Sequence, residues 1–281
     1  MIPEAPFLSV SIDVSYRNKP GVLKSVFLQM RQGEVLGLIG QSGSGKSTLG
    51  LAILRLLELK GGKAEGSIFF QGRDLLKLKE REMRRLRGSE IGLVLQSPLS
   101  SLNPALRIGT QLAEAWKAHA SGSREEMRRR IEDALLSVAL PCDQEFLRRF
   151  PSQLSVGQAQ RVLIAMAVMH RPSLLIADEP TSALDVITQK EVLQLFRKLN
   201  QDTGTGILFI SHDLLSVANI CDRIAILNKG ELVECGLTGQ IFNHPAHPYT
   251  KQLIAALPEK PAILSDRNYE RLMRPGVLTV Q

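Results

Sequence analysis

A run near the start of the chain has the composition of a phosphate-binding loop. It consists of Gly40, Gln41, Ser42, Gly43, Ser44, Gly45, Lys46, Ser47 and then Thr48. Glycines let the backbone turn so that successive N–H groups face one anion, and the start of the following helix adds the positive end of its dipole. The Lys46 ammonium can reach the β- and γ-phosphates, and the Ser47 hydroxyl can ligate Mg²⁺. The run predicts a nucleotide site; the plainer alternative is a glycine- and serine-rich turn.

Two adjacent carboxylates in the second half of the chain are suited to the hydrolysis of such a nucleotide. Asp178 and Glu179 follow the apolar run 174–177 and precede Pro180. Open α/β sheets place their chemistry at the carboxyl ends of parallel strands, which is where this pair is expected. Asp178 can hold Mg²⁺ through water, and Glu179 can act as the general base toward the attacking water. Taken alone, such a pair is also common at the start of a helix.

The sequence LSVGQ at 154–158 resembles the LSGGQ signature of the ATP-binding cassette (ABC) ATPases. The resemblance implies that Ser155, Gly157 and Gln158 face the γ-phosphate of an ATP molecule held by a second subunit. Ser155 and Gln158 also fit the capping box S-x-x-Q, and the two interpretations are compatible because a capped helix start attracts anions. Val156 replaces the first glycine of the pattern and adds bulk near the phosphate. We therefore expect a weakened signature half-site.

Further landmarks of the same family follow in the expected order, and the resemblance covers about Leu8 to Gly236. It implies that Tyr16 stacks on adenine, and that Gln96 senses Mg²⁺ and the attacking water. It also implies that His212 contacts the γ-phosphate and that residues 182–185 touch the partner cassette. Taken alone, each residue also has a plainer interpretation. Tyr16 could be a core or edge-strand aromatic residue, Gln96 a loop residue, and His212 a polar residue at a strand end.

Two segments are similar to one subfamily, the oligopeptide, dipeptide and nickel importer ATPases. Residues 96–104 match its extension after the glutamine, which ends in SLNP, and residues 244–253 match its H-P-Y-T-x-x-L element. On composition alone these segments are a proline-broken loop and a short amphipathic helix. The resemblance implies an ATP- and Mg²⁺-dependent ATPase that powers uptake of peptides or nickel.

The same resemblance implies a set of partners. The chain would pair with a second ABC ATPase subunit, identical or different, and closure of this dimer on ATP would drive two transmembrane permease subunits. A substrate-binding protein would deliver the cargo to them. We expect the chain to be peripheral, at the cytoplasmic face of the cell (inner) membrane. Two alternatives remain: a regulatory nucleotide-binding subunit that hydrolyses poorly because of Val156, and a soluble ABC ATPase acting on nucleic acid.

The elements that must position these residues form an α/β pattern. Apolar runs at 35–39, 174–177 and 206–211 predict buried strands of a parallel core sheet. The resemblance adds an N-terminal antiparallel β subdomain and a helical insert at about 97–154. We expect an ABC cassette over 1–236 and a C-terminal extension over 237–281. Further predicted elements are a helix at 48–57, a strand at 66–70, a helix at 155–170 and a hairpin at 223–227 and 231–235.

Composition agrees with a membrane-associated protein without a membrane span. The 281 residues are 44% hydrophobic and contain neither a run of eighteen apolar residues nor an N-terminal targeting pattern. Three scattered cysteines favour a reducing compartment. The net charge of +7 suits an anionic membrane surface, whereas no aromatic-rich basic stripe points to nucleic acid. Much of the arginine content is expected to pair along helices, as Glu80 with Arg84, Glu125 with Arg129 and Glu126 with Arg130.

Overall fold

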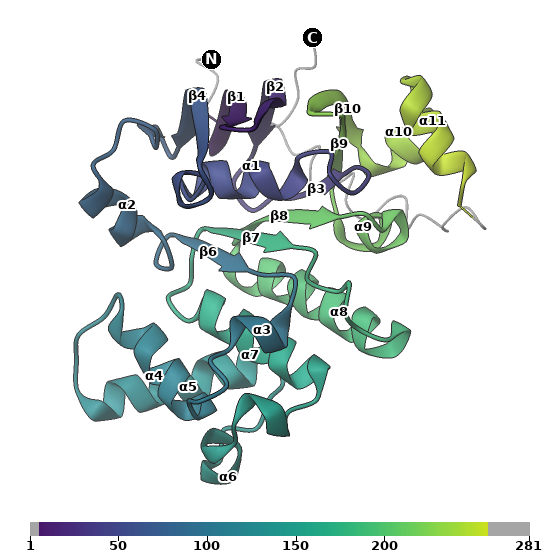
Figure 1. Cartoon of the computed structure of the whole chain (residues 1–281). Coiled ribbons are helices and arrows are strands. Elements are labelled where there is room, and N and C mark those ends of the chain that lie inside the picture. The colour runs from purple at the N-terminus through teal and green to yellow at the C-terminus, as the bar shows by residue number, and fades with distance from the viewer. Residues whose placement is uncertain (1–5, 258–281) are drawn as a thin grey trace, which may run out of the picture.

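Two β-sheets and the helices around them form the molecule (Figure 1). The structure is a computed structural model and describes residues 6–257. The smaller sheet is antiparallel and has the strand order β2-β1-β4-β5. Its strands are β1 (Leu8–Tyr16), β2 (Lys19–Met30), β4 (Gly62–Phe70) and β5 (Arg73–Asp74). The predicted antiparallel subdomain and the strand at 66–70 are confirmed.

The larger sheet carries the predicted chemistry and has the order β10-β9-β3-β8-β7-β6. The pairs of β3 with β8 and β9, and of β7 with β6 and β8, are parallel, whereas β9 and β10 form the antiparallel hairpin predicted from the sequence. The strands are β3 (Val35–Ile39), β6 (Ile91–Val94), β7 (Leu174–Asp178), β8 (Gly206–Ser211), β9 (Arg223–Asn228) and β10 (Glu231–Leu237). Because β3, β6, β7 and β8 run in one direction, the residues that follow them meet at one sheet edge.

Alternation along the buried strands divides the core into two layers. In β3, Leu36 and Leu38 pack with α1 (Lys46–Ile53) and the smaller sheet, whereas Val35 and Ile39 pack on the other side, with α7 (Val156–Val168) and α8 (Val186–Thr203). Successive side chains of a strand point to opposite faces of the sheet. A strand whose residues are all apolar is therefore expected to be buried on both faces. Figure 1 shows α1 between the two sheets and α7 and α8 beyond the larger one.

A group of helices lies between β6 and β7, and all of it except the last helix, which begins at Val156, falls within the helical insert predicted at about 97–154. The helices of this group are α3 (Pro98–Ser101), α4 (Ile108–Lys117), α5 (Arg124–Ser137), α6 (Gln144–Arg148) and α7 (Val156–Val168), with a 3₁₀ turn at Pro151–Gln153. The others are α1 (Lys46–Ile53), α2 (Glu80–Leu86), α8 (Val186–Thr203), α9 (Leu214–Ile220), α10 (Thr238–Asn243) and α11 (Pro248–Ala255), with a 3₁₀ turn at Glu58–Lys60. None of the helices in residues 6–257 combines the length and apolar character needed to cross a bilayer.

Two expectations need correction. The helix predicted at 48–57 ends at Ile53, because Arg55 has a left-handed backbone (φ 51°) that turns the chain and lets Leu57 enter the core. Of the helical ion pairs, Glu80 with Arg84 (3.7 Å) and Glu125 with Arg129 (3.4 Å) form. The third does not, since Glu126 instead accepts a hydrogen bond from the Ser123 backbone N–H (2.7 Å) and completes the capping box of α5.

Candidate nucleotide-binding site

The loop between β3 and α1 has the backbone of an anion cradle. Gly43 and Gly45 adopt positive φ values of 78° and 109°, which L-residues with a side chain rarely adopt. At Gly40 the requirement is space, because an added Cβ would lie 2.1 Å from the Leu227 carbonyl oxygen. The glycines of the predicted motif are thus explained by a strained turn and by close backbone approach. Within the loop, Gln41 and Ser42 are exposed and the Ser44 side chain is buried, while Thr48 in the first turn of α1 is half-buried.

Lys46 and Ser47 begin α1 and face the loop and the carboxylates. Lys46 Nζ donates to the carbonyl oxygens of Gly40 (2.7 Å) and Gln41 (3.1 Å), which uses two of its three N–H donors. Burial lowers the pKa of the Lys46 ammonium, an effect opposed by the charges of Glu179 and Asp178. The Ser47 hydroxyl donates to Asp178 Oδ1 (2.9 Å). The remaining donor of Lys46 can serve a phosphate oxygen while the loop stays intact.

Glu179 joins three strands of the larger sheet. It follows β7, its N–H donates to the Ile210 carbonyl oxygen of β8 (2.9 Å), and its Oε2 accepts from Gln96 Nε2 (2.8 Å) beyond β6. Its Oε1 lies 3.2 Å from His212 Nδ1, beyond β8. The structure therefore brings the three predicted catalytic residues into direct contact. Glu179 also has a φ of 47°, a left-handed conformation that costs energy in a non-glycine residue and is concentrated at functional sites.

Asp178 precedes Glu179, at the last position of β7, and is half-buried. Burial raises the pKa of its carboxyl, the Ser47 hydrogen bond lowers it, and the neighbouring Glu179 charge raises it again. Such a carboxylate gains from a nearby cation, because pairing offsets its desolvation. Ser47, Asp178 and the Gln96 amide supply the hard oxygen donors that Mg²⁺ prefers. With few protein carboxylates, a Mg²⁺ ion typically completes its shell with water and substrate phosphates. The donor set therefore fits Mg²⁺.

The signature residues lie at the start of α7 and form the predicted capping box. Ser155 Oγ accepts from the Gln158 N–H (3.2 Å), and the Ser155 N–H donates to Gln158 Oε1 (3.1 Å). Gly157 packs against Thr188 of α8, so that an added Cβ would lie 2.6 Å from Thr188 Cγ2. No hydrogen bond or ion pair among residues 6–257 joins this segment to the phosphate loop. Within the described chain, the signature is therefore not bonded to the nucleotide loop.

Tyr16 likewise forms no hydrogen bond or ion pair with the loop in the described part of the chain. It ends β1, is half-buried, and its ring lies so close to Gly62 that an added Cβ there would be 2.7 Å from the ring. The smaller sheet still reaches the loop elsewhere, because a Cβ at Gly45 would lie 2.5 Å from Leu23 Cδ2 of β2. The smaller sheet thus helps to shape the loop, while the adenine contact of Tyr16 stays a prediction.

Sequence reasoning missed a polar network beside Glu179 and His212. Gln189 of α8 donates to Asp213 Oδ2 (2.9 Å) and Ser216 Oγ (2.6 Å), and Asp213 caps α9 through the Leu215 N–H (2.9 Å). Gln189 and Asp213 border a cavity of about 220 Å³ that Glu179 and His212 also line. In the sequence, the only sign of this network is that Asp213 precedes an apolar helical run. That pattern predicts a helix cap and nothing more. The network ties the start of α8 to the residues that follow β8.

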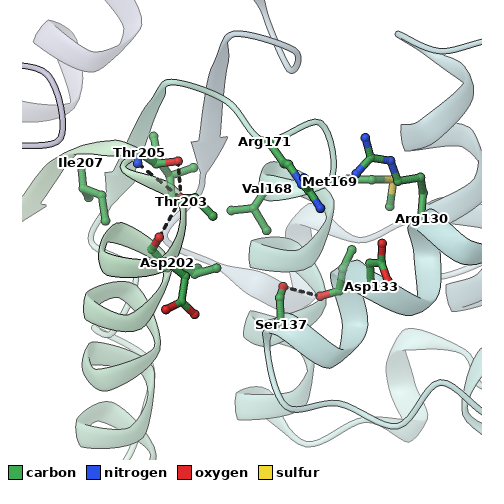
Figure 2. A pocket seen from close by; sticks show the side chains of 13 residues that line it. Arg130, Asp133, Ser137, Val168, Met169, Arg171, Asp202, Thr203, Thr205 and Ile207 are labelled. Atoms are coloured by element: carbon green, nitrogen blue, oxygen red, sulfur yellow. Dashed lines mark hydrogen bonds between the residues drawn. The ribbon is translucent and has the colours of Figure 1, made fainter.

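A second cavity, of about 490 Å³, lies away from this site (Figure 2). Leu175 and Ile207 line it near the beginnings of β7 and β8, at the opposite edge of the sheet from Asp178. Two hydroxyl groups of its lining donate to backbone carbonyl oxygens of the protein. Ser137 Oγ donates to the Ala134 oxygen (2.8 Å) and Thr205 Oγ1 to the Pro172 oxygen (2.8 Å). The carboxyl edge of the larger sheet is therefore where the predicted catalytic and phosphate-binding residues gather.

Comparisons with known proteins agree with this geometry. The ABC transporter family profile matches residues 23–182, and the profile of the oligopeptide/dipeptide transporter C-terminal region matches residues 233–270. The oligopeptide transport ATP-binding protein OppD of Bacillus subtilis is 42% identical over 245 residues, covering 87% of this chain and 68% of that protein. The glutathione import ATP-binding protein GsiA of Salmonella typhimurium is 44% identical over 243 residues, covering 84% of this chain. The chain spans 39% of the length of that relative.

Solved structures show the same fold. The dimeric ATP-binding cassette MJ0796 bound to ADP and Pi superposes with a TM-score of 0.70 at 29% identity, covering 82% of this chain and 98% of that one. CbiO1 from Clostridium perfringens, part of the ABC transporter complex cbiONQ, gives a TM-score of 0.75 at 26% identity. The match covers 91% of this chain and 97% of that one. Together with the sequence matches and the phosphate loop, they show that the chain belongs to the ABC transporter family as an ATP-binding ATPase subunit of the peptide importer branch.

Proposed function

We propose that this ATPase hydrolyses Mg²⁺-ATP at the carboxyl edge of its larger sheet to power uptake of peptides through partner permease subunits. The observation that carries the proposal is the contact of Glu179 with both Gln96 (2.8 Å) and His212 (3.2 Å). A carboxylate held by two polar partners beside a phosphate loop has the arrangement of a general base for water. Oligopeptides and glutathione are the cargoes named for the relatives, so we infer a peptide cargo; nickel stays a possible cargo of the same subfamily.

The chain's own residues divide the work among them. Loop N–H groups from 40–48 and the third N–H donor of Lys46 bind the phosphates. Ser47 and Asp178, with Gln96, would hold Mg²⁺, which when bound neutralises charge on the phosphates. Glu179 takes the proton from the attacking water, and Gln96 and His212 fix the direction of its carboxylate. The left-handed backbone of Glu179 keeps this side chain aimed from the strand end.

A second subunit is needed to complete each nucleotide site. No hydrogen bond or ion pair of the described residues joins the signature at the start of α7 to the loop of its own chain, and exposed apolar side chains lie beside the signature. Val186 and Ile187 are 82% and 74% exposed, and they precede Thr188, which contacts Gly157. Exposed apolar residues next to a functional helix start support an interface. We infer a homo- or heteromeric ATPase dimer in which each signature covers the partner's ATP.

The membrane partners are inferred from the segment after β6. Leu95 and Leu99 are 42% and 45% exposed beside Gln96, so this segment joins the catalytic glutamine to an apolar surface. We infer that two permease subunits dock here, fed by a substrate-binding protein, and that the basic chain lies against anionic lipid at the cytoplasmic face of the inner membrane.

We propose that the chain is divided into an ABC cassette over 1–236, with a helical insert at about 97–154, and a C-terminal extension over 237–281. Residues 258–281 of the extension lie outside the described part of the chain.

Glu179→Gln tests the assigned base. We expect ATP binding to persist, hydrolysis to slow by roughly 10²- to 10⁴-fold, and an ATP-bound dimer to accumulate. Nucleotide titration, phosphate release and size-exclusion chromatography with ATP measure the three effects. Glu65→Gln is the matched control, because Glu65 is exposed on β4 and pairs only with Lys63 (2.7 Å). Normal turnover in Glu179→Gln, without added dimer, would remove Glu179 from the mechanism.

A further inference from the structure

A hydrogen bond joins the phosphate loop to the helix that follows the β9–β10 hairpin. The backbone N–H of Gln41 donates to the hydroxyl oxygen of Tyr249 (3.2 Å), across 208 positions of sequence. Tyr249 lies in α11, within the H-P-Y-T element, and its half-buried ring packs against the larger core cluster. A side chain outside the strand–loop–helix unit thus supports the start of that loop.

The start of α11 is held in place from two directions. Both carboxylate oxygens of Glu234 on β10 accept backbone N–H groups, from Ala246 (2.8 Å) and His247 (3.0 Å). His247 Nδ1 in turn accepts the N–H of Tyr249 (3.1 Å) and caps the helix. Ile254, one to two turns further on, is 7% exposed and belongs to the same core cluster. The hydroxyl of Tyr249 is therefore presented to Gln41 by a fixed element.

The contact matters for nucleotide because Gln41 has two roles in the loop. Its N–H meets Tyr249, while its carbonyl oxygen accepts from Lys46 Nζ (3.1 Å). The N–H of Gln41 belongs to the same planar peptide unit as the Gly40 carbonyl group, so fixing this N–H also fixes the direction of that carbonyl, which accepts from Lys46 Nζ (2.7 Å). A loop already held in its binding geometry loses less conformational freedom when the ligand arrives. Lys46 keeps one N–H donor for phosphate in this arrangement.

We propose that Tyr249 is a positioning residue for ATP binding, and that docking of α11 is thereby coupled to occupancy of the phosphate loop. The proposal rests on the proposed function, because it assumes that the loop 40–48 binds ATP. Coupling of this kind is reciprocal: docked α11 strengthens ATP binding, and bound ATP strengthens the docking of α11. Anything that pulls α11 from the hairpin therefore weakens ATP binding without touching a phosphate-binding group.

Tyr249→Phe removes the hydroxyl and keeps the ring. One neutral hydrogen bond predicts that the Kd and KM for ATP rise by roughly 2- to 10-fold. We expect kcat to stay unchanged, because the catalytic contacts of Glu179 are retained. Isothermal titration calorimetry and steady-state ATPase assays on the full chain give the two quantities. An unchanged Kd, tighter binding, or a loss confined to kcat would each overturn the proposal.

Two further variants separate the anchor from general damage to α11. Glu234→Ala removes both acceptors and should also raise the Kd for ATP, and combining it with Tyr249→Phe should add little, since both act through one contact. Gln252→Ala is the control, because Gln252 is exposed on the same helix and should leave the Kd unchanged. Independent, multiplicative effects of the two changes would overturn the coupling, as would an equal loss in Gln252→Ala.

Lys46→Ala in the same titration distinguishes failure of this inference from failure of the proposed function. If Lys46→Ala loses ATP while Tyr249→Phe binds it normally, the loop is the ATP site and the role of Tyr249 is wrong. If Lys46→Ala binds ATP normally, the loop is not the site and both proposals fall. The inference stands if Lys46→Ala loses binding and Tyr249→Phe weakens it as described.

Discussion

Single residues of this site carry charge in positions that suit an anionic ligand. Lys46 has the only side-chain cation in the run 40–48, and its ammonium is buried against two carbonyl oxygens although burial lowers its pKa. Burying a charged group is costly unless strong partners compensate, and hydrogen bonds to phosphate are among the strongest available. The lysine is therefore better suited to the nucleotide-bound loop than to stabilising the empty one.

Lys46→Ala should abolish useful ATP binding. The loop would keep its backbone N–H groups but lose its one side-chain cation, which we propose to face the β- and γ-phosphates. Nucleotide titration of the purified variant measures this, with Lys63→Ala as a control, because the exposed Lys63 ammonium pairs with Glu65 of β4. If Lys46→Ala binds ATP with the affinity of the unchanged chain, the run 40–48 is not the phosphate-binding loop.

At the scale of elements, the starts of α7 and α8 are locked together. The Thr188 hydroxyl donates to Asp185 Oδ2 (2.7 Å), and Asp185 Oδ1 accepts the N–H groups of Ile187 (3.1 Å) and Thr188 (3.0 Å) to cap α8. The methyl group of the same threonine occupies the space that a side chain at Gly157 would need. The signature glycine is therefore required by the packing of two helix starts, in addition to its proposed place near phosphate.

Gly157→Ala should destabilise the chain, and Thr188→Ser should relieve the effect. The overpacking cost of roughly 1–3 kcal/mol exceeds the helix-propensity gain of up to about 1 kcal/mol. Serine lacks the Cγ2 methyl but keeps the hydroxyl that bonds to Asp185. Urea unfolding of both single variants and the double variant measures the coupling. Strictly additive losses would show that the two positions do not interact in this way.

For the whole molecule, Val156 predicts two unequal composite sites. Val156 is the first residue of α7 and is 37% exposed, so it is accessible at the surface that the proposed dimer would place against the partner's ATP. We expect it to slow turnover mainly at the partner's phosphate loop. Val156→Gly in the assembled transporter, with each subunit's catalytic glutamate removed in turn, should raise hydrolysis at that site alone. If neither site changes, the valine is a tolerated residue of the first turn.

The overall charge of +7 leads to a prediction about partners. Pairs such as Arg161 with Glu191 (2.7 Å) and Arg87 with Glu80 (2.6 Å) neutralise part of the arginine content, and the surplus is expected to face anionic lipid. A filter-binding assay at physiological salt should therefore show no tight association with DNA or RNA. Tight binding that falls steeply as salt rises would reverse this expectation.

The sequence by itself determined the elements whose signals are local. A glycine run between an apolar strand and a helix, continuously apolar strands, and S-x-x-Q before a helix each depend on neighbours within a few residues, and these predictions agree with the structure. The end of α1 was predicted too late because the left-handed turn at Arg55 serves the burial of Leu57 in the core, which no local propensity expresses.

Only the tertiary structure decided which distant residues meet. The parallel order of β6, β7, β8 and β3 brings Gln96, Glu179 and His212 to one edge, and the family pattern alone had suggested their association. The contacts of Gln41 with Tyr249 and of Gly157 with Thr188 join segments that have no common periodicity or motif. Such contacts depend on the packing of whole elements, because side-chain direction and the distance between elements are set by the core and not by neighbours in sequence.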